Sequence, residues 1–442
     1  MKKVLLLIPP NKKGFIRDVY YGCWHKKKFI DYSWPPIGLY QLDAVLKKNF
    51  ESLVVDGSIL NDEQTLSKIK DFSPDFVIIN VGTFTFKDDL AYIKQVKGRS
   101  KVIVYGEFAT TSVKECLSET CIEYAIKGEP EGVISNLLNN IENPERLKKI
   151  DGVCFEDYIH PNSAFVHDLD SLPFPTRGIN EAISYQNPFT VKKPFTTVLT
   201  TRGCPHSCIF CTVPVLYGKT FRRRSVKNVL EELKMLKEQG FKEIFFRDEN
   251  ITLHKKIVQD LCKGMIKNEL KFSWMCNSRI DTINKETLEL MKESGCFLIK
   301  FGVESGNQEI IDNIKKGIRL VDVENIFKIC KKLGIGTVAH FMIGNLGDDE
   351  EAIKKTIDFA IKLDPDYASF DKVIIYPGTD LSKINYKPLD DGLLEHYHNL
   401  AFKRFYLRPT KVIKQTFKLM SFEQLKKLTE ATFVLWKSLL KK

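Results

Sequence analysis

The feature that most constrains the fold is an alternation of short apolar runs with helical patterns, which occurs twice along the 442 residues. Over residues 1–140 the apolar runs predict strands at 4–8, 53–55, 76–81 and 102–105, and the helical patterns lie at 37–48, 63–71 and 88–96. Strands that alternate with helices in this way predict a doubly wound parallel sheet. Ligands of such sheets bind beyond the carboxyl ends of the strands, where Gly82 and Gly106 stand.

A second alternation begins at Phe195, after a proline-punctuated segment at 172–176. Its predicted strands lie at 196–200, 243–247, 272–277, 298–303, 337–343 and 367–376, with helices such as 225–239, 285–294 and 320–333 between them. Six such units in about 185 residues predict a partial parallel barrel, since a full eight-stranded barrel needs about 250. Functional residues are expected just after the strands.

These patterns divide the chain into a first domain (1–145), a linker (146–190), a barrel (191–385) and a basic helical C-terminal region (386–442). No apolar run reaches the roughly 18 residues of a spanning helix. The first apolar run ends at Pro9-Pro10 without a cleavage site, so we expect a cytoplasmic protein. Eleven cysteines in such a chain predict free thiols rather than a disulfide framework.

The C-terminal region is strongly basic. The net charge of the chain is +11, and from Ala401 onward eleven Lys or Arg residues face only Glu423 and Glu430. Apolar residues recur there at helical spacing, at Leu425, Leu428, Thr432, Leu435 and Leu439. Two interpretations are open: a surface helix packed on the barrel, or an interfacial helix that makes peripheral membrane contact. The charge favours an anionic, small-molecule or lipid-like substrate.

The sharpest motif is Cys204-Pro205-His206-Ser207-Cys208-Ile209-Phe210-Cys211, directly after the first barrel strand. Cysteine thiolates hold iron–sulfur clusters, four for a complete [4Fe–4S] set. Three cysteines on one loop leave one iron without a protein ligand, and an open metal position is where chemistry takes place. The alternative is a zinc site with His206 as the fourth ligand, but His206 lies between two of the cysteines and the geometry is cramped.

This CxxxCxxC loop, with the aromatic Phe210 before its last cysteine, resembles the cluster motif of the radical S-adenosylmethionine (SAM) superfamily, whose fold is a partial (βα)6 barrel. The resemblance implies a [4Fe–4S] cluster on Cys204, Cys208 and Cys211. It also implies that the open iron binds SAM, that reductive cleavage yields a 5′-deoxyadenosyl radical, and that a flavodoxin- or ferredoxin-type protein donates the electron.

The resemblance also suggests SAM-binding residues at successive strand ends. Asp248 and Glu249 follow the second barrel strand and would accept from the methionine ammonium group; a solvated acidic turn is the alternative. Arg279 suits the methionine carboxylate, or makes a structural ion pair. The full set is Phe210, Asp248, Glu249, Arg279, Glu304, Ser305 and Gly344, of which Glu304 would contact the ribose and Gly344 the adenine.

The first domain and its proline-containing linker resemble the cobalamin-binding class that precedes such barrels. Segments 34–39, 128–129 and 405–409 match the habits of that class. The motif Asp-x-His-x-x-Gly after the first strand is missing, so a corrinoid would bind without a histidine ligand. The candidate cobalamin-binding residues are Thr83, Thr85, Gly106, Glu107, Gly128 and Glu129.

This resemblance favours a cobalamin-dependent methyltransferase that acts on an unactivated carbon. The alternative is a cobalamin-associated cyclase, mutase or other carbon-skeleton enzyme without net methylation. A tRNA methylthiotransferase would carry a second cysteine cluster, which Cys23, Cys116 and Cys121 do not match, so no nucleic acid is expected. An iron–sulfur redox or scaffold protein would not need the acids and Arg279. His396, Tyr397 and His398 are expected either to line the site or to lie on a helix surface.

Overall fold

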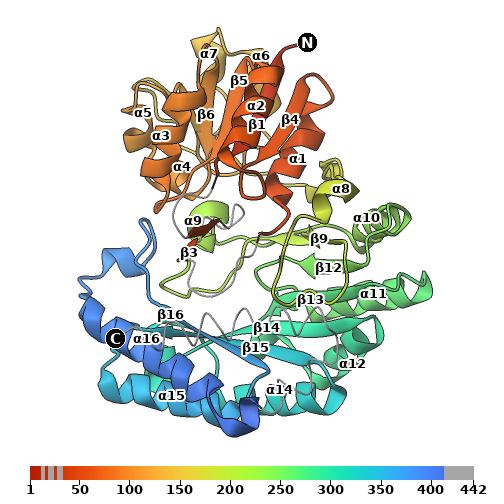
Figure 1. Cartoon of the computed structure of the whole chain (residues 1–442), viewed down its shortest axis with the longest axis vertical. Coiled ribbons are helices and arrows are strands. Elements are labelled where there is room, and N and C mark those ends of the chain that lie inside the picture. The colour runs from red at the N-terminus through yellow and green to blue at the C-terminus, as the bar shows by residue number, and fades with distance from the viewer. Residues whose placement is uncertain (11–14, 18–23, 27–32, 413–442) are drawn as a thin grey trace.

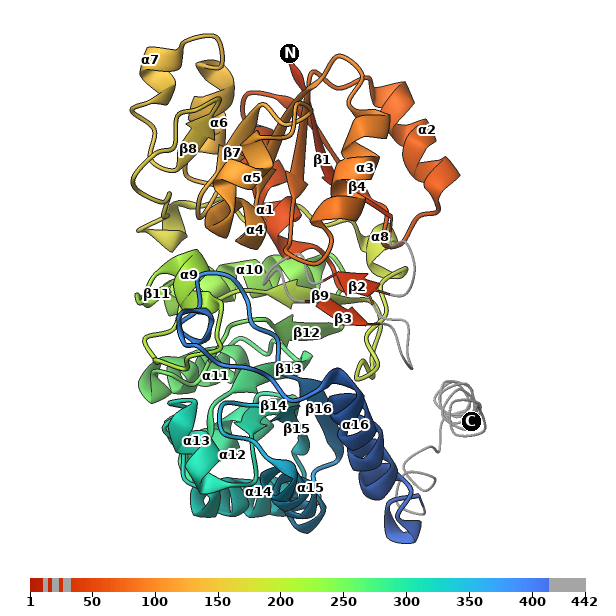
Figure 2. The same ribbon diagram turned by 90° about the vertical axis from the view of Figure 1, so that its left-hand side faces the viewer.

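The computed structural model describes residues 1–10, 15–17, 24–26 and 33–412. Figure 1 shows two α/β parts, one above the other, joined by an extended segment that includes the short helix α8 (Ile179–Ala182). A two-stranded ribbon, β2 (Phe15–Arg17) and β3 (Trp24–Lys26), lies between the two parts (Figure 2). The predicted helix at 425–439 falls outside the described residues.

The first part is a six-stranded sheet in the order β4-β1-β5-β6-β7-β8. The strands are β1 (Lys3–Ile8), β4 (Glu51–Asp56), β5 (Phe76–Asn80), β6 (Lys101–Tyr105), β7 (Tyr124–Ile126) and β8 (Val153–Phe155). The helices are α1 (Ile37–Leu46), α2 (Asp62–Phe72), α3 (Phe86–Val96), α4 (Glu107–Thr111), α5 (Val113–Leu117), α6 (Ile134–Asn139) and α7 (Pro144–Leu147).

Both faces of this sheet are buried, as expected of a parallel sheet covered by helices. Along β1, Val4, Leu6 and Ile8 enter one hydrophobic core, whereas Leu5 and Leu7 enter the core on the opposite face. Neighbouring strands of this sheet pair in parallel, except for β7 and β8, which are antiparallel. The predicted doubly wound sheet is therefore confirmed.

The edge strand β8 was not predicted. It lies at residues 153–155, inside the segment expected to be a linker, and pairs antiparallel with β7. It has only three residues, all fully or nearly fully buried. A run this short carries no readable alternation, because the period of a strand needs four or more residues to be recognised.

The second part is a sheet of six parallel strands in the order β16-β15-β14-β13-β12-β9. The strands are β9 (Phe195–Val198), β12 (Glu243–Phe246), β13 (Ser273–Ser278), β14 (Cys296–Glu304), β15 (Gly336–Ile343) and β16 (Tyr367–Lys372). The large helices are α10 (Val226–Glu238), α11 (Lys255–Lys267), α12 (Lys285–Glu293), α14 (Leu320–Leu333), α15 (Glu350–Leu363) and α16 (Asp391–Tyr406).

Within the described ranges the outer strands β9 and β16 do not pair, so the sheet is a partial barrel, as predicted. Ile244 and Phe246 of β12 join the main core under the helices, while Phe245 faces the opposite side of the sheet. Short elements complete this part: β10 (Thr201–Arg202), α9 (Val213–Tyr217), β11 (Arg222–Arg223), α13 (Gln308–Asn313), and 3-10 turns at Leu169–Ser171, Ile280–Thr282 and Leu381–Lys383.

Helix α16 packs on the barrel rather than over its mouth. His398 Nδ1 lies 2.6 Å from the carbonyl of Phe370, and the hydroxyl of Tyr397 donates to Glu350 at 2.5 Å, whereas His396 is exposed. Of these three residues only His396 lies on the helix surface, whereas Tyr397 and His398 are buried where α16 packs on the barrel. Among the described helices none is long and apolar enough to cross a membrane.

The two parts meet through loops at the carboxyl ends of their strands. Helix α4, which follows β6, contacts α9, which follows the cysteine loop. The ring of Phe84, after β5, stands edge-on to Tyr376, after β16, with centroids 5.7 Å apart. A Cβ atom added at Gly378 would lie 3.3 Å from both Thr111 of the first part and Val215 of the second. We call this boundary the seam; it brings the two predicted cofactor-binding edges together (Figure 2).

Candidate active site

The cysteine loop runs from the end of β10 to α9. Cys204, Cys208 and Cys211 are free, partly buried thiols, and Cys204 and Cys211 pack against Val213, Leu216 and Tyr217. Gly203, directly before the loop, has φ +86°, and a Cβ there would lie 2.2 Å from the carbonyl of Thr220. Only glycine therefore allows the loop to begin here.

The thiols of the loop are partly shielded from water, and the guanidinium of Arg279 lies beside them. Burial raises the pKa of the Cys204 thiol, and the Arg279 guanidinium opposes that rise. Burial likewise raises the pKa of Cys211. Arg279 Nη1 donates to Cys208 Sγ at 3.5 Å. A nearby guanidinium stabilises the thiolate form that metal ligation requires.

The ligand geometry of zinc differs from that of an iron–sulfur cluster. Zinc requires all its thiolate ligands at about 2.3 Å from one point. In the described part of the chain no three His, Cys, Asp or Glu side chains converge on such a position. An iron–sulfur cube binds each cysteine at a different iron, so the three free thiols of this loop would each hold one iron.

Two acids follow β12 with unused acceptors. Asp248 Oδ1 accepts from Thr200 N at 2.9 Å, from Thr200 Oγ1 at 2.8 Å and from Thr201 Oγ1 at 2.5 Å. Asp248 Oδ2 and both carboxylate oxygens of Glu249 are buried and accept no hydrogen bond from the described residues. Burial raises the pKa of Glu249 to about 8. Buried acceptors without donors are costly, so these oxygens fit an incoming ammonium group.

Arg279 and Glu304 already have partners. The Arg279 guanidinium bonds both carboxylate oxygens of Asp281 at 3.0 Å and the carbonyl of Lys316 at 2.5 Å. The Lys316 ammonium pairs with Glu304 Oε1, also at 2.5 Å. The structural ion pair foreseen for Arg279 is thus present, while its role toward SAM stays a prediction. Sequence reasoning missed Lys316, because nothing in its local sequence indicates that it links Arg279 to Glu304.

The remaining predicted SAM residues lie around the same strand ends. Phe210 packs beside Ile209 in a small apolar cluster. Ser305 Oγ lies 2.9 Å from Thr356 Oγ1. Gly344 has φ +85°, and its carbonyl accepts from the hydroxyl of Tyr386. These contacts place the residues at the carboxyl ends of β9, β14 and β15 and leave their roles as predictions.

At the carboxyl edge of the first sheet, Thr83 forms hydrogen bonds with the buried Glu107. Thr83 Oγ1 donates to Glu107 at 2.7 Å, and the Thr83 N–H does so at 3.1 Å. Burial raises the pKa of Glu107. Gly106 has φ +109°, and a Cβ there would lie 2.8 Å from Asn80 Nδ2. Thr85 instead donates to Asp89 at 2.7 Å at the start of α3.

Between Thr83 and Thr85, the side chain of Phe84 is 44% exposed at the seam. A large apolar ring at a sheet edge where ligands bind fits the broad face of a corrin. Sequence reasoning named both neighbours of Phe84 and missed Phe84 itself, because an apolar residue in a strand-end loop gives no signal apart from its exposure.

Gly128 and Glu129 have other partners. Gly128 has φ +89° and packs against Ala164, whose carbonyl would lie 2.3 Å from an added Cβ. Both carboxylate oxygens of Glu129 contact Arg222, at 2.6 and 2.9 Å. The carboxylate of Glu129 is therefore directed at the barrel, and its predicted contact with cobalamin is without support in the observed geometry.

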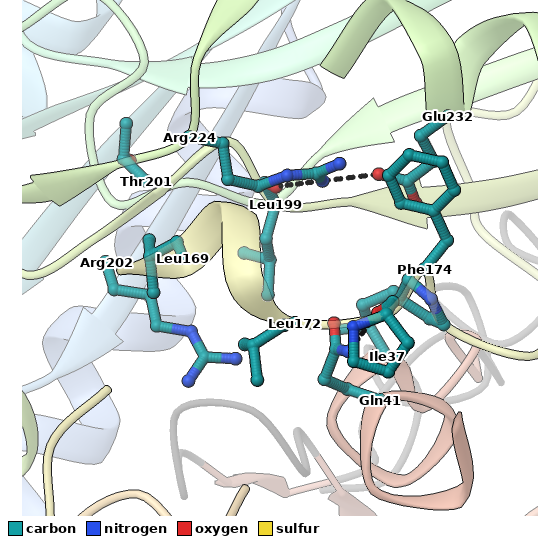
Figure 3. A pocket seen from close by; sticks show the side chains of 12 residues that line it. Ile37, Gln41, Leu169, Leu172, Phe174, Leu199, Thr201, Arg202, Arg224 and Glu232 are labelled. Atoms are coloured by element: carbon teal, nitrogen blue, oxygen red, sulfur yellow. Dashed lines mark hydrogen bonds and ion pairs between the residues drawn. The ribbon is translucent and has the colours of Figure 1, made fainter. Parts of the chain in front are cut away.

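A small pocket lies beside the seam, where the linker crosses from one part to the other (Figure 3). It is lined by Ile37, Gln41, Leu169, Leu172, Pro173, Phe174, Pro175, Leu199, Thr201, Arg202, Arg224 and Glu232. Arg224 and Arg177 both pair with the buried Glu232. These ion pairs fasten the linker and the end of β9 to α10, next to the start of the cysteine loop.

Comparisons with known proteins agree with this geometry. A family model described as the Radical SAM superfamily matches residues 198–360, and a B12 binding domain model matches residues 30–138. An uncharacterized methyltransferase of Pyrococcus horikoshii is 30% identical, over 94% of this chain and 95% of that protein. The cytidylyl-2-hydroxyethylphosphonate methyltransferase of Streptomyces wedmorensis is 25% identical, over 76% of this chain and 74% of that protein.

Among solved structures, the radical SAM methyltransferase TsrM of Kitasatospora setae, with cobalamin and a [4Fe-4S] cluster bound, has the same fold. Its TM-score is 0.70 at 18% identity, and the match covers 86% of this chain and 77% of that one.

A partial barrel with a three-cysteine loop, preceded by a doubly wound sheet, defines an iron–sulfur enzyme that cleaves SAM. The chain belongs to the radical SAM superfamily, in the subgroup that carries a B12-binding domain. Its cofactors are those typical of this subgroup, a [4Fe–4S] cluster, SAM and cobalamin. The predicted family, fold class and cofactors are thus confirmed.

Proposed function

We propose that this enzyme is a cobalamin-dependent methyltransferase that acts on an unactivated carbon. The observation that carries the proposal is the seam, where the edge of the B12-binding sheet and the cysteine loop face each other through α4 and α9. Two relatives that align along most of the chain are named methyltransferases, which supports the proposal. When bound, the three cofactors supply hydrogen-atom abstraction and a transferable methyl group.

The chain's own residues would bind SAM and orient it beside the cysteine loop. Asp248 is held by Thr200 and Thr201 so that its second oxygen, together with Glu249, can accept from the ammonium group of SAM. Arg279 offsets negative charge beside Cys208. Phe84 and Tyr376 form an edge-to-face aromatic contact that joins the two parts across the seam.

The test starts from protein purified without oxygen, reconstituted with iron and sulfide, and loaded with hydroxocobalamin. After reduction, SAM with a deuterated methyl group is added, and methylcobalamin, S-adenosylhomocysteine and 5′-deoxyadenosine are measured by mass spectrometry. Label transfer to cobalamin with S-adenosylhomocysteine release is the expected result. Formation of 5′-deoxyadenosine and a substrate product without the label would favour the cyclase or mutase alternative and contradict the proposal.

We further propose a small or lipid-like anionic substrate and an external flavodoxin- or ferredoxin-type electron donor. The net charge of +11 supports the anionic substrate. We also expect the basic C-terminal region to contact an anionic membrane surface. Sedimentation of the full chain with anionic but not neutral vesicles would support that contact, and equal sedimentation with both would contradict it.

A further inference from the structure

The cysteine loop is closed at its base by a minimal hairpin. Arg202 ends β10 and Arg222 begins β11, and these two residues pair with each other in antiparallel register, as do Thr201 and Arg223. The segment 203–221, which contains the three cysteines, connects these two strands. A ribbon of two residue pairs has little stability of its own, so the position of the loop depends on what holds the two arginines.

Both arginines are held by the first domain. Glu129 binds Arg222 with both oxygens, at 2.6 and 2.9 Å, and lies 3.5 Å from Arg202 Nη1. Glu131 Oε1 accepts from Arg202 Nη2 at 2.7 Å. We call these four side chains the seam tetrad; each is at most 10% exposed. The tetrad therefore forms buried ion pairs between the B12-binding domain and the base of the cluster loop.

The backbone of the linker takes part in the same contact. Glu129 Oε2 also accepts from the N–H of Val166 at 2.5 Å, and Arg222 Nη1 donates to the carbonyl of Val166 at 2.6 Å. The backbone of Val166 thus bonds to both members of the Glu129–Arg222 ion pair. At least three donors therefore fix the orientation of the Glu129 carboxylate. The carboxylate in turn fixes the orientation of the Arg222 guanidinium.

Stability alone gives no reason to bury four charges here. Replacing a buried ion pair by apolar side chains is often neutral or stabilising. What the pairs add is direction, because a guanidinium and a carboxylate in a two-bond contact have a fixed relative orientation. Arg202 stands two residues before Cys204, so a shift of this arginine moves a cluster ligand.

We propose that Glu129 and Glu131 are positioning residues, which hold the cluster loop through Arg202 and Arg222 at a fixed separation from the cobalamin edge. The expected effect on catalysis rests on the proposed function, because methyl transfer would use the cluster and cobalamin in one reaction. A displacement of about 1 Å at a reacting centre can cost about 100-fold in rate. Loosening the seam tetrad should therefore uncouple SAM cleavage from methyl transfer.

The test uses the full chain loaded with cluster and cobalamin, as wild type, Glu129→Gln and Arg222→Lys. Glu142→Gln is the matched control, because Glu142 also pairs with a cation of the first domain but its side chain is 78% exposed. After reduction, cob(II)alamin and the reduced cluster are both paramagnetic, and electron paramagnetic resonance reports the magnetic interaction between them. This readout depends on separation and needs no turnover.

We expect both seam variants to bind iron and cobalamin as wild type does and to show a weakened or broadened interaction, with methyl transfer reduced about 100-fold and SAM cleavage retained. An unchanged interaction in a loaded variant would overturn the inference. So would loss of both cofactors from both variants, since the tetrad would then serve folding alone. If the interaction changes but even wild type transfers no methyl group, the positioning stands and the proposed function fails.

Discussion

Asp248 and Glu249 present three buried carboxylate oxygens that lack a donor within the described residues. In a folded chain such acceptors persist when a ligand supplies the missing hydrogen bonds. At the scale of single residues, this observation singles out the acids more sharply than their sequence position does.

Replacing Glu249 by Gln should weaken SAM binding. The neutral amide loses charge-assisted acceptance from an ammonium group, so the Kd for SAM should rise about 10-fold to 100-fold. The measurement is anaerobic titration of reconstituted protein, with iron content unchanged. Glu309→Gln, at an exposed acid on α13, is the control. Equal affinities of the two variants would show that Glu249 does not contact SAM.

Replacing Cys208 by Ala should abolish the cluster, because two thiolates from one loop cannot anchor it at three irons. The expected result is loss of iron-dependent visible absorption after anaerobic reconstitution. Cys330→Ala is the control, since Cys330 is fully buried in the main core of the barrel. Full iron content in Cys208→Ala would contradict the assignment of the ligands.

The sequence can predict single residues whose role depends on local spacing. The three cysteines and the two acids after β12 are residues of this kind. The ion pair of Glu129 was not predicted, because its partner Arg222 lies 93 residues away in the chain, and the cobalamin contact of Glu129 stays a prediction. No local pattern encodes an ion pair across two domains.

At the scale of elements, the strand β12 begins at a buried acid. Glu243 is fully buried, and its Oε2 accepts from the N–H groups of Val191 and Lys192 at 2.9 and 2.8 Å. It thereby ties the end of the linker to the amino end of the barrel sheet. Burial raises the pKa of Glu243 from 4.5 to about 7.

This shift predicts a pH dependence of stability. Because the folded state holds the proton more tightly than the unfolded state, stability should fall as pH rises from about 4.5 to about 7, by about 3 kcal/mol from this group. Glu243→Gln should remove that part of the slope. Chemical denaturation of both proteins at about pH 5 and about pH 8 measures it. Parallel pH profiles for the two would contradict the prediction.

The longer elements were predictable because they carry a continuous apolar run or a helical pattern. Most strands of both sheets and the large helices are of this kind. The short strands β2, β3, β7, β8, β10 and β11 were not predicted, since two or three residues carry no period and their pairing partners are set by the tertiary structure. Strand β16 ends at Lys372, four residues earlier than the apolar pattern suggests.

At the scale of the whole molecule, segments that follow strands of both sheets meet at the seam, as α4 does with α9. The sequence predicts each edge separately, because ligand sites follow the strands in both folds. It does not predict that the edges meet, which depends on contacts such as that of Phe84 with Tyr376.

Replacing Phe84 by Ala should therefore weaken cobalamin binding and leave the cluster intact. Loss of the apolar contact should raise the Kd for cobalamin about 10-fold. Cobalt and iron per chain after desalting give the measurement. Val321→Ala is the control, since Val321 is similarly exposed, at 54%, but lies on α14. Undiminished cobalt in Phe84→Ala would exclude Phe84 from the corrinoid site.

The seam tetrad also has a consequence for biosynthesis. The first sheet is complete once β8, ending at Phe155, has left the ribosome, whereas Arg222 follows Glu129 by 93 residues. At ordinary translation rates the stretch from Phe155 to Arg222 takes about 3 to 13 s to synthesise, and domains fold as units in the order of their synthesis. During that time Glu129 and Glu131 remain hydrated on a nascent, already folded domain. Their dehydration by the arriving arginines is thus a late assembly step, which joins two separately folded halves into one enzyme.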